Sequence, residues 1–412
     1  MIVFGLSSLR GAALNFKFFS HVLKNGLPCW TVIQNWVLRY GLYKLLQPLP
    51  KRDDWILILD HTIEFGTKTC LVALAISREM FLKRDCLLRH CDMEVATIRT
   101  KQCSTGKDIA GILAELSAEM GCPAQIVSDA GSNIKAGIRI FKETVAINNP
   151  ETKVVSTYDI THKTAILLKH LLEDDCCWNE FNKKLAETKR RVVHTEFVAY
   201  APNKPREKAR WLNLEERVKW AENIIAIKAK HGRPTKVEKE WWKKFHEHYA
   251  WVKDYRRSIT QWRAYLEILA VAKSEIKQNG LSKQTAKIFA KKVKRVKSKR
   301  KKIVKLKAQL TTFLTHEAAE FGDYGKWLGT SDIIESVFGK YKVFSAKTPL
   351  KEIGKSVLTI PVFISRVTLQ EVKEAMESIS DKRLKNWLAE NIGTSLFSKR
   401  RTAFPAQKRK TA

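Results

Sequence analysis

The sequence predicts an α/β core that is interrupted by a large all-α block. Strand-like and helix-like patterns alternate over residues 53–158, whereas apolar residues recur at helical spacing throughout residues 168–315. Beyond Gly325 the sequence returns to short amphipathic helical patterns. With 44% hydrophobic residues among 412, the chain has enough apolar surface for two or three domains, each with its own core.

The charge of the chain narrows its partners. Lys and Arg number 75 and Asp and Glu number 42, which gives a formal net charge of +33. Such an excess attracts polyanions, and counterion release makes a nucleic-acid backbone the most favourable of them. No apolar run reaches the ~18 residues of a membrane span. The eight cysteines show no CxxC spacing, which indicates a reducing compartment.

Residues 1–52 contain seven basic residues and no acidic one. Helical patterns are predicted at 9–23 and 31–42, separated by Gly26 and Pro28. The second pattern places three large side chains on one face, namely Val32, Trp36 and Tyr40. Two interpretations stay open: a helix-turn-helix-like segment in which Arg39 contacts DNA, or a small helical cap on the next domain.

Residues 53–158 are expected to form the first part of the α/β core. Near-continuous apolar runs at 55–60 and 67–76, joined by a turn at Gly66, suit central strands that are covered on both faces. The elements that follow are expected to be a helix at 104–120, a strand at 124–129, a helix after "AGSN" and a strand at 153–159.

An aspartate ends three of these strands, at Asp60, Asp129 and Asp159. An ionised carboxylate at the end of a buried strand is costly to desolvate unless a cation or hydrogen-bond donors meet it. In α/β sheets the carboxyl edge is where binding sites assemble. A metal-binding edge is one interpretation. A turn residue at Asp60 and a helix cap at Asp129 are the alternatives.

The all-α block ends in a strongly basic segment that has no acidic residue from Ile276 to His316. Four apolar residues recur in it every seven positions, at Phe289, Val296, Ile303 and Leu310. This pattern predicts one long basic helix over 283–310 with a narrow apolar seam. We expect Lys291, Lys294 and Arg295 to contact a phosphate backbone; a solvated charged helix is the alternative.

The stretch "TSDIIESVFGKYKVF" is an amphipathic helix that begins near Glu335. Lys342 lies seven residues later on the same helical face, with Lys340 nearby. The spacing of Asp332 and Glu335 is also that of a capping box, in which the glutamate folds back onto the start of the helix. Three other acids are substitutes for Glu335, namely Glu317, Glu320 and Asp323.

Taken together, the order of these parts resembles the DDE transposases of bacterial-type insertion sequences. In one group of these enzymes an all-α insertion separates the last strand of an RNase H-like core from the helix that bears the glutamate. The matching motifs are "LDHT" around Asp60, "VSDAGSN" around Asp129, "YDITH" with Asp159 and His162, and "SDIIESVFGKYK" around Glu335. The resemblance covers most of residues 53–345.

The resemblance implies an RNase H-like mixed sheet with an N-terminal helix-turn-helix-like segment and a large all-α insertion. The domains expected are 1–52, helical and DNA-binding; 53–167, the first part of the core; 168–320, the basic all-α insertion; 321–397, the last part of the core; and 398–412, a basic disordered tail. Because the sequence starts almost on the first helix, we expect no second end-binding domain before it, and a truncated copy is an alternative.

The resemblance also implies the catalytic chemistry. Asp60, Asp129 and Glu335 would be the catalytic residues and would hold two Mg²⁺ or Mn²⁺ ions, with Asp60 bridging both. Two ions ~4 Å apart activate the attacking oxygen and stabilise the leaving oxygen at one phosphorus, and such hard cations prefer carboxylate ligands. The reaction would be cleavage at transposon ends followed by strand transfer into target DNA.

Other residues receive roles from the same resemblance. Lys342 and Lys340 would hold the terminal DNA phosphate. Asp159 and His162 are similar to a [C/D]xxH signature, in which His162 would position the scissile strand or a flipped base, and a structural histidine is the alternative. Thr62 resembles the threonine of a D-x-T motif that orients the site without ligating metal.

The expected partners are double-stranded DNA, as element ends and as target, and further copies of the chain in a dimer or larger assembly on DNA. The expected location is the cytoplasm, in association with the nucleoid. Two alternatives share part of this pattern: an RNase H-like structure-specific nuclease, such as a junction resolvase, and a non-catalytic DNA-binding protein derived from a transposase.

Overall fold

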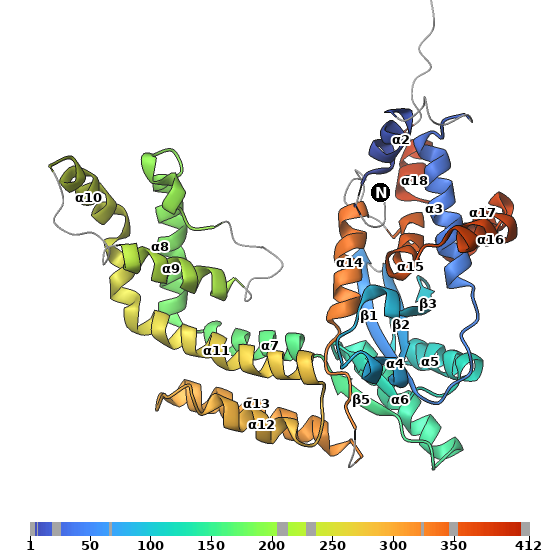
Figure 1. Cartoon of the computed structure of the whole chain (residues 1–412), viewed down its shortest axis with the longest axis horizontal. Coiled ribbons are helices and arrows are strands. Elements are labelled where there is room, and N and C mark those ends of the chain that lie inside the picture. The colour runs from blue at the N-terminus through green and yellow to red at the C-terminus, as the bar shows by residue number, and fades with distance from the viewer. Residues whose placement is uncertain are drawn as a thin grey trace, which may run out of the picture. The chain divides into compact units, whose positions relative to one another are not determined.

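The computed structural model describes residues 5, 7–18, 26–65, 68–203, 213–227, 236–322, 325–345 and 353–404. The chain forms two compact units (Figure 1). Unit 1 comprises Met1–Asp159, Gln278–Gly280 and Lys326–Ala412, and unit 2 comprises Ile160–Lys277 and Leu281–Gly325. Unit 2 is therefore largely inserted between the last strand of unit 1 and the segment that begins at Lys326.

Unit 1 is built on a five-stranded mixed sheet with the order β3-β2-β1-β4-β5. The strands are β1 Trp55–Phe65, β2 Lys68–Ser77, β3 Glu94–Arg99, β4 Gln125–Ser128 and β5 Val155–Tyr158. β2 is antiparallel to β1 and β3, whereas β4 is parallel to β1 and β5. The expected mixed sheet is confirmed, and β3 is an additional edge strand. The predicted turn at Gly66 lies outside the described residues.

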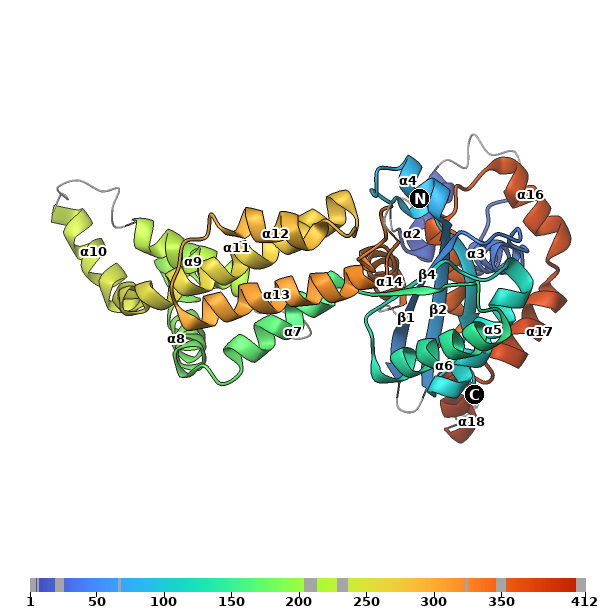
Figure 2. The ribbon, with the colours of Figure 1, turned by 90° about the horizontal axis from the view of Figure 1, so that it is seen from below.

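Both faces of the sheet are covered by helices. On one face lie α5 Gly106–Met120 and α6 Ser132–Asn148, side by side (Figure 2). On the other face lie α14 Asp332–Ser345, the 3₁₀ turn η5 Lys355–Leu358 and α15 Thr359–Ile364. Side chains of β1 enter both cores in alternation, with Ile56 and Ile58 on one side and Leu57 and Leu59 on the other. This double burial explains the continuous apolar run of β1.

Two short elements follow β2 in unit 1. Helix α4 Arg78–Lys83 begins after Ser77, whose hydroxyl accepts a hydrogen bond from the amide of Met80 at 3.2 Å. The 3₁₀ turn η1 His90–Asp92 then leads into β3. The carboxylate of Asp92 is buried and bonds the guanidinium of Arg84, which fixes η1 on the fold.

The N-terminal helices pack against the C-terminal ones. The elements are α2 Leu9–Phe18 and α3 Trp30–Leu45, with α16 Leu369–Ser378, α17 Asp381–Asn391 and α18 Leu396–Ala403. Leu38 and Leu42 of α3 share a core with Leu358, Ile379 and Leu384. This is the arrangement of the helical-cap alternative. Residues 19–23, predicted to continue the first helix, lie outside the described residues.

The face of α3 that carries Val32, Trp36 and Tyr40 is only partly buried. Val32 is 39% exposed and Trp36 is 41% exposed, whereas Tyr40 is buried. Helical periodicity shows that a face exists but not which side a later part of the chain will cover, and here α15 to α17 cover the side of Leu38 and Leu42.

The tail also differs from the expectation. Residues 398–403, expected to be disordered, belong to α18, which Ser395 caps by accepting a hydrogen bond from the amide of Ser398 at 3.0 Å. Residues 405–412 lie outside the described residues.

Unit 2 is helical throughout its described part. Its elements are α7 Ile160–Leu172, α8 Cys176–Val192, η2 Glu196–Tyr200, α9 Leu214–Ile227, α10 Lys236–Tyr249, η4 Ala250–Tyr255, α11 Arg256–Asn279, α12 Thr285–Val293 and α13 Lys301–Ala319. Aromatic rings form much of its core, with Phe181 in contact with Trp178, Trp251 and Trp262. Among the described residues, no helix combines the length and apolar character that a membrane crossing requires.

The prediction of one long basic helix over 283–310 is wrong. The chain forms α12 and α13, which pack against each other (Figure 2), and residues 294–300 connect them. Successive lysines and arginines in the connection would repel one another at helical i,i+4 spacing. The apolar seam itself is confirmed, because Phe289, Val296, Ile303 and Leu310 are all buried.

Candidate active site

The register of the parallel strands brings the three predicted aspartates to one edge of the sheet. Leu59 of β1 lies opposite Ser128 of β4, and Ser128 lies opposite Tyr158 of β5. Asp60, Asp129 and Asp159 each follow directly. They therefore occupy equivalent register positions on three adjacent strands. Asp129 and Asp159 directly follow the ends of β4 and β5, as the sequence predicted, whereas Asp60 lies within β1, which continues to Phe65.

Asp60 lies inside β1, opposite Val72 of β2, just before a register shift between His61 and Glu64. Its side chain is partly buried, and the backbone amide of His61 stabilises the carboxylate. The irregularity interrupts the regular pairing of β1 with β2 just beyond Asp60, and the strand continues to Phe65.

Asp129 is held by a strained turn between β4 and α6. Ala130 has φ = +53°, a left-handed conformation that disfavours residues with a Cβ. The turn lets the amide of Gly131 donate to Asp129 Oδ1 at 2.9 Å and the amide of Ala130 donate to Ser128 Oγ at 3.2 Å. The carboxylate of Asp129 is thereby oriented by its own turn. Backbone strain of this kind tends to occur at functional sites.

Glu335 lies in the first turn of α14 and is exposed. Its amide donates to the carbonyl of Ser331 at 3.2 Å, so Ser331 is the N-cap and Asp332 is the first helical residue. The capping-box alternative required Asp332 as the N-cap, and the structure does not have that arrangement. Of the substitutes, Glu317 and Glu320 belong to unit 2, and Asp323 lies outside the described residues.

Electrostatics links these residues. Burial, followed by the neighbouring charges of Asp129 and Glu335, raises the pKa of Asp60 from its ordinary value of 3.8 to about 7, against the opposing effects of the His61 amide and the ammonium of Lys342. Three acids from β1, the end of β4 and α14 are therefore close enough to act on one another, with Lys342 opposing them.

The chemistry of this cluster fits a divalent cation. Its donors are carboxylate oxygens, the ligands that Mg²⁺ and Mn²⁺ prefer, and a cation would offset both the burial and the neighbouring carboxylate charges that raise the pKa of Asp60. Within the described ranges, however, no three His, Cys, Asp or Glu side chains have the spacing of a complete metal-ligand set. Mutual repulsion of three carboxylates favours such separation.

Asp159 has a different environment from the other two aspartates. Its side chain is fully buried, and Oδ1 accepts a hydrogen bond from the amide of Ser331 at 3.2 Å. A carboxylate at the N-terminus of a helix is also favoured by the helix dipole. Asp159 therefore contacts the start of α14, the helix that carries Glu335.

Lys340 contacts residues that sequence analysis did not select. Its Nζ lies 3.0 Å from His90 Nδ1, and His90 Nε2 lies 3.1 Å from Ser336 Oγ. Burial and the charge of Lys340 lower the pKa of His90, so the neutral imidazole can accept from the ammonium. Lys340 and Lys342 thus have different neighbours, although both lie on α14.

Arg39 is engaged within the fold. Its guanidinium donates to the carbonyls of Met376 and Ile379 at the end of α16 and lies 3.7 Å from Asp381. Only 18% of its side chain is exposed. These contacts join α3 to the C-terminal helices, and they give Arg39 a structural role.

The remaining predicted residues are dispersed. His162 lies on α7 of unit 2, whereas Thr62 lies in β1 and its side chain is outside the described part. The three predicted DNA-contacting cations of the basic segment, Lys291, Lys294 and Arg295, are exposed on α12 and just after it.

Two buried polar residues of the sheet were missed. Gln125 begins β4 and Thr157 lies in β5, and both bond the backbone of Leu328, which precedes α14. A glutamine at the start of the apolar run "QIVS" was the available signal, because a buried amide requires partners.

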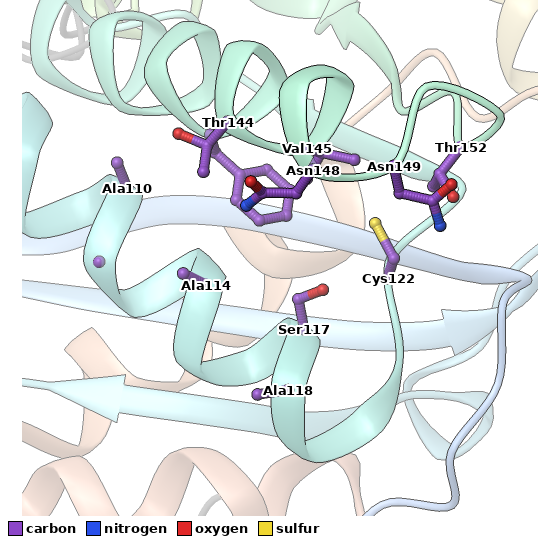
Figure 3. A pocket seen from close by; sticks show the side chains of 12 residues that line it. Ala110, Ala114, Ser117, Ala118, Cys122, Thr144, Val145, Asn148, Asn149 and Thr152 are labelled. Atoms are coloured by element: carbon purple, nitrogen blue, oxygen red, sulfur yellow. The ribbon is translucent and has the colours of Figure 1, made fainter.

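A groove of about 520 Å³ lies between α5 and α6, away from these acids (Figure 3). Its lining consists mainly of small or polar side chains, including Ala110, Ala114, Ser117, Thr144 and Asn148. None of Asp60, Asp129 and Glu335 lines it. The groove is therefore separate from the candidate site.

Comparison with known proteins adds one distant likeness. No family model matches the chain, and no curated protein matches it. Among solved structures, a chain of the Drosophila P element transposase strand transfer complex is similar at 12% identity, with a TM-score of 0.40, covering 86% of this chain and 89% of that chain.

Proposed function

We propose that the protein is a DNA transposase whose catalytic residues are Asp60, Asp129 and Glu335. One observation supports this most strongly: the register of β1 and β4 aligns Asp60 with Asp129 on adjacent strands, and the charges of Asp129 and Glu335 both contribute, after burial, to the raised pKa of Asp60. In a structural ion pair, a positively charged group normally lies against a negatively charged one. A cluster of like charges at a sheet edge is instead a feature of sites that bind a cation or a proton.

The three acids would hold two divalent cations, Mg²⁺ or Mn²⁺, which supply an activated attacking oxygen and a stabilised leaving oxygen. The charges of both other acids raise the pKa of Asp60, which is therefore the residue suited to contact both ions. Asp129 keeps its orientation through the hydrogen bond from Gly131. Lys342, which also acts on Asp60, is suited to hold a DNA phosphate beside the acids.

The substrate would be double-stranded DNA. The net charge of +33 and the exposed Lys291, Lys294 and Arg295 support a phosphate-binding surface. The sequence resemblance supports action on the ends of a mobile element, with cleavage followed by joining to target DNA, in a dimer or larger assembly. Contacts to phosphate would hold DNA without reading its sequence.

Strand transfer tests the proposal. The substrate is duplex DNA that carries the element's own ends, taken from genomic sequence on either side of the gene, with Mg²⁺ or Mn²⁺ present. Asp60→Asn, Asp129→Asn and Glu335→Gln should each reduce the rate by about 10³-fold or more, because loss of ~4 kcal/mol of transition-state stabilisation has that effect. Duplex binding should persist. Asp332→Asn, three residues before Glu335, is the control and should retain activity.

A non-catalytic DNA-binding protein is the second candidate. It is favoured by the lack of a complete three-residue ligand set among the described side chains. If wild-type protein binds duplex DNA but neither cleaves nor joins any ends with either metal, this candidate replaces the transposase. Cleavage of branched DNA without joining would instead indicate a structure-specific nuclease.

A further inference from the structure

The segment that re-enters unit 1 at Lys326 reaches α14 within six residues. Three buried polar side chains of β4, β5 and the residue after β5 form hydrogen bonds with the backbone of this segment. Gln125 is fully buried, and Thr157 and Asp159 are nearly or fully so. Polar groups with so little access to water require partners inside the protein.

Gln125 bonds both backbone polar groups of one residue. Its Nε2 donates to Leu328 O at 2.6 Å, and Leu328 N donates to its Oε1 at 3.1 Å. Thr157 completes the arrangement, since its hydroxyl donates to the same carbonyl at 2.8 Å and accepts from Gln125 Nε2 at 2.8 Å. Each buried donor and acceptor of this group is thereby used.

A second hydrogen bond to the segment lies at Ser331, three residues after Leu328. The amide of Ser331 donates to Asp159 Oδ1 at 3.2 Å, and both residues are buried. The carbonyl of Ser331 in turn accepts the first hydrogen bonds of α14, including that from Glu335. The path from the strands to Glu335 is therefore a continuous series of hydrogen bonds.

We propose that Gln125, Thr157 and Asp159 act as positioning residues for the metal site, through the register that they impose on α14. This inference rests on the proposed function. Only one register satisfies both polar groups of Leu328 and the amide of Ser331, and each lost buried hydrogen bond costs about 1–3 kcal/mol. A shift by one residue would rotate α14 by about 100°, which would carry Glu335 and Lys342 away from Asp60.

Apolar packing is the competing explanation for the position of α14. Ile334, Val337, Phe338 and Tyr341 are buried against the sheet. Burial of apolar surface is non-directional, so on its own it permits adjustments that directional hydrogen bonds to the backbone forbid. The two explanations differ in what happens when a hydrogen bond is removed while volume is kept.

The test uses the full-length protein without DNA and compares four variants. Gln125→Met and Thr157→Val remove hydrogen bonds at nearly constant volume. Asp159→Leu removes the acceptor for the amide of Ser331. Thr359→Val is the matched control, because Thr359 is equally buried in unit 1 and its hydroxyl donates to Ser356 O at 2.7 Å, away from the 326–331 segment. Mn²⁺ binding is measured by electron paramagnetic resonance, and amide exchange by mass spectrometry.

Gln125→Met and Thr157→Val should weaken Mn²⁺ binding by about 10-fold or more, the usual effect of losing a group that orients a ligand. Exchange should accelerate at residues 328–335 specifically. Asp159→Leu, which removes the acceptor for the amide of Ser331, should have the same two effects, whereas Thr359→Val should remain close to wild type in both measurements. If Gln125→Met does not fold, Thr157→Val, which loses a single hydroxyl, decides the outcome.

Different results would contradict the metal-dependent function and the positioning role. If wild-type protein binds no Mn²⁺, the metal-dependent function fails, and faster exchange at 328–335 in Gln125→Met but not in Thr359→Val still supports the positioning role. If Gln125→Met and Thr157→Val bind Mn²⁺ as tightly as wild type, or exchange at 328–335 is unchanged, the positioning role is overturned and the function stands.

Discussion

In unit 1, Asp60 lies partly buried beside two other carboxylates, whereas in unit 2 the cations of α12 and α13 lie mostly on the surface. Several of these cations have partners within unit 2: Lys292 pairs with Glu275, and Lys302 with Asp175 at 2.8 Å. Exposed like charges are screened by water and salt and cost little. Buried like charges are not, so the small acidic cluster is stronger evidence of a site than the much larger basic surface.

Replacing Asp60 by a neutral residue is the most direct test of the unfavourable charge in unit 1. Its folded pKa of about 7 exceeds its ordinary 3.8, so the unfolded chain loses the proton first as pH rises. The free energy of unfolding should therefore fall between pH ~4 and ~7 and stay low above that. We expect Asp60→Asn to be more stable than wild type at pH 8 by about 1–3 kcal/mol, because partial exposure weakens the full effect.

Urea unfolding of both proteins at pH 5 and pH 8 measures this difference, which should shrink towards pH 5. Mg²⁺ or Mn²⁺ should stabilise the wild type at pH 8 and have little effect on Asp60→Asn. Equal pH dependence in the two proteins would mean that Asp60 is not under the influence of its neighbours, and the proposed site would lose its main support.

Features of the site that depend on local sequence were predictable, whereas those that depend on contacts with distant residues were not. The strands that carry Asp60 and Asp129 were predictable because burial on both faces leaves a continuous apolar run, as at Ile56 to Leu59. β3 was missed, since as an edge strand it is short and alternates buried with partly exposed residues. The glutamine in the apolar run of β4 signalled a need for partners, but the sequence could not identify the partner of Gln125, which is the backbone of Leu328, 203 residues away.

The same reason explains the failures in the helical regions. A period of seven identified the buried seam from Phe289 to Leu310, but it could not reveal the break between α12 and α13. Likewise, the side of α3 that is buried depends on helices more than 300 residues later, whose carbonyls also engage Arg39. Local spacing predicts elements and faces, whereas contacts between distant segments decide which face is used.

The exposed lysines of α12 in unit 2 provide a second test of the difference between the two units. Lys287, Lys291 and Lys294 are exposed and follow one another at i, i+4 and i+7, along one face of α12. If each lysine contacts a phosphate, replacing all three by Gln should make the negative slope of log affinity against log salt shallower by about 2.7. Lys302→Gln is the control, because Lys302 is paired with Asp175, and it should change the slope little.

Fluorescence anisotropy with a duplex of arbitrary sequence, from 50 to 200 mM salt, gives these slopes. Sequence should matter little, because contacts to phosphate carry no base information. A triple variant with an unchanged slope would remove α12 from the DNA surface, and the high charge of this segment would then be a solvated face.

The smallest expected effect concerns backbone strain beside the acids. Ala130 holds φ = +53° directly after Asp129, a conformation in which glycine avoids the penalty of a Cβ. Ala130→Gly should raise the free energy of unfolding by up to about 1 kcal/mol, since the relief of strain exceeds the added entropy of the unfolded chain. Calorimetry or urea unfolding measures it, with Ala136→Gly within α6 as a control that should destabilise by a similar amount. If Ala130→Gly is also destabilising, the turn is not strained.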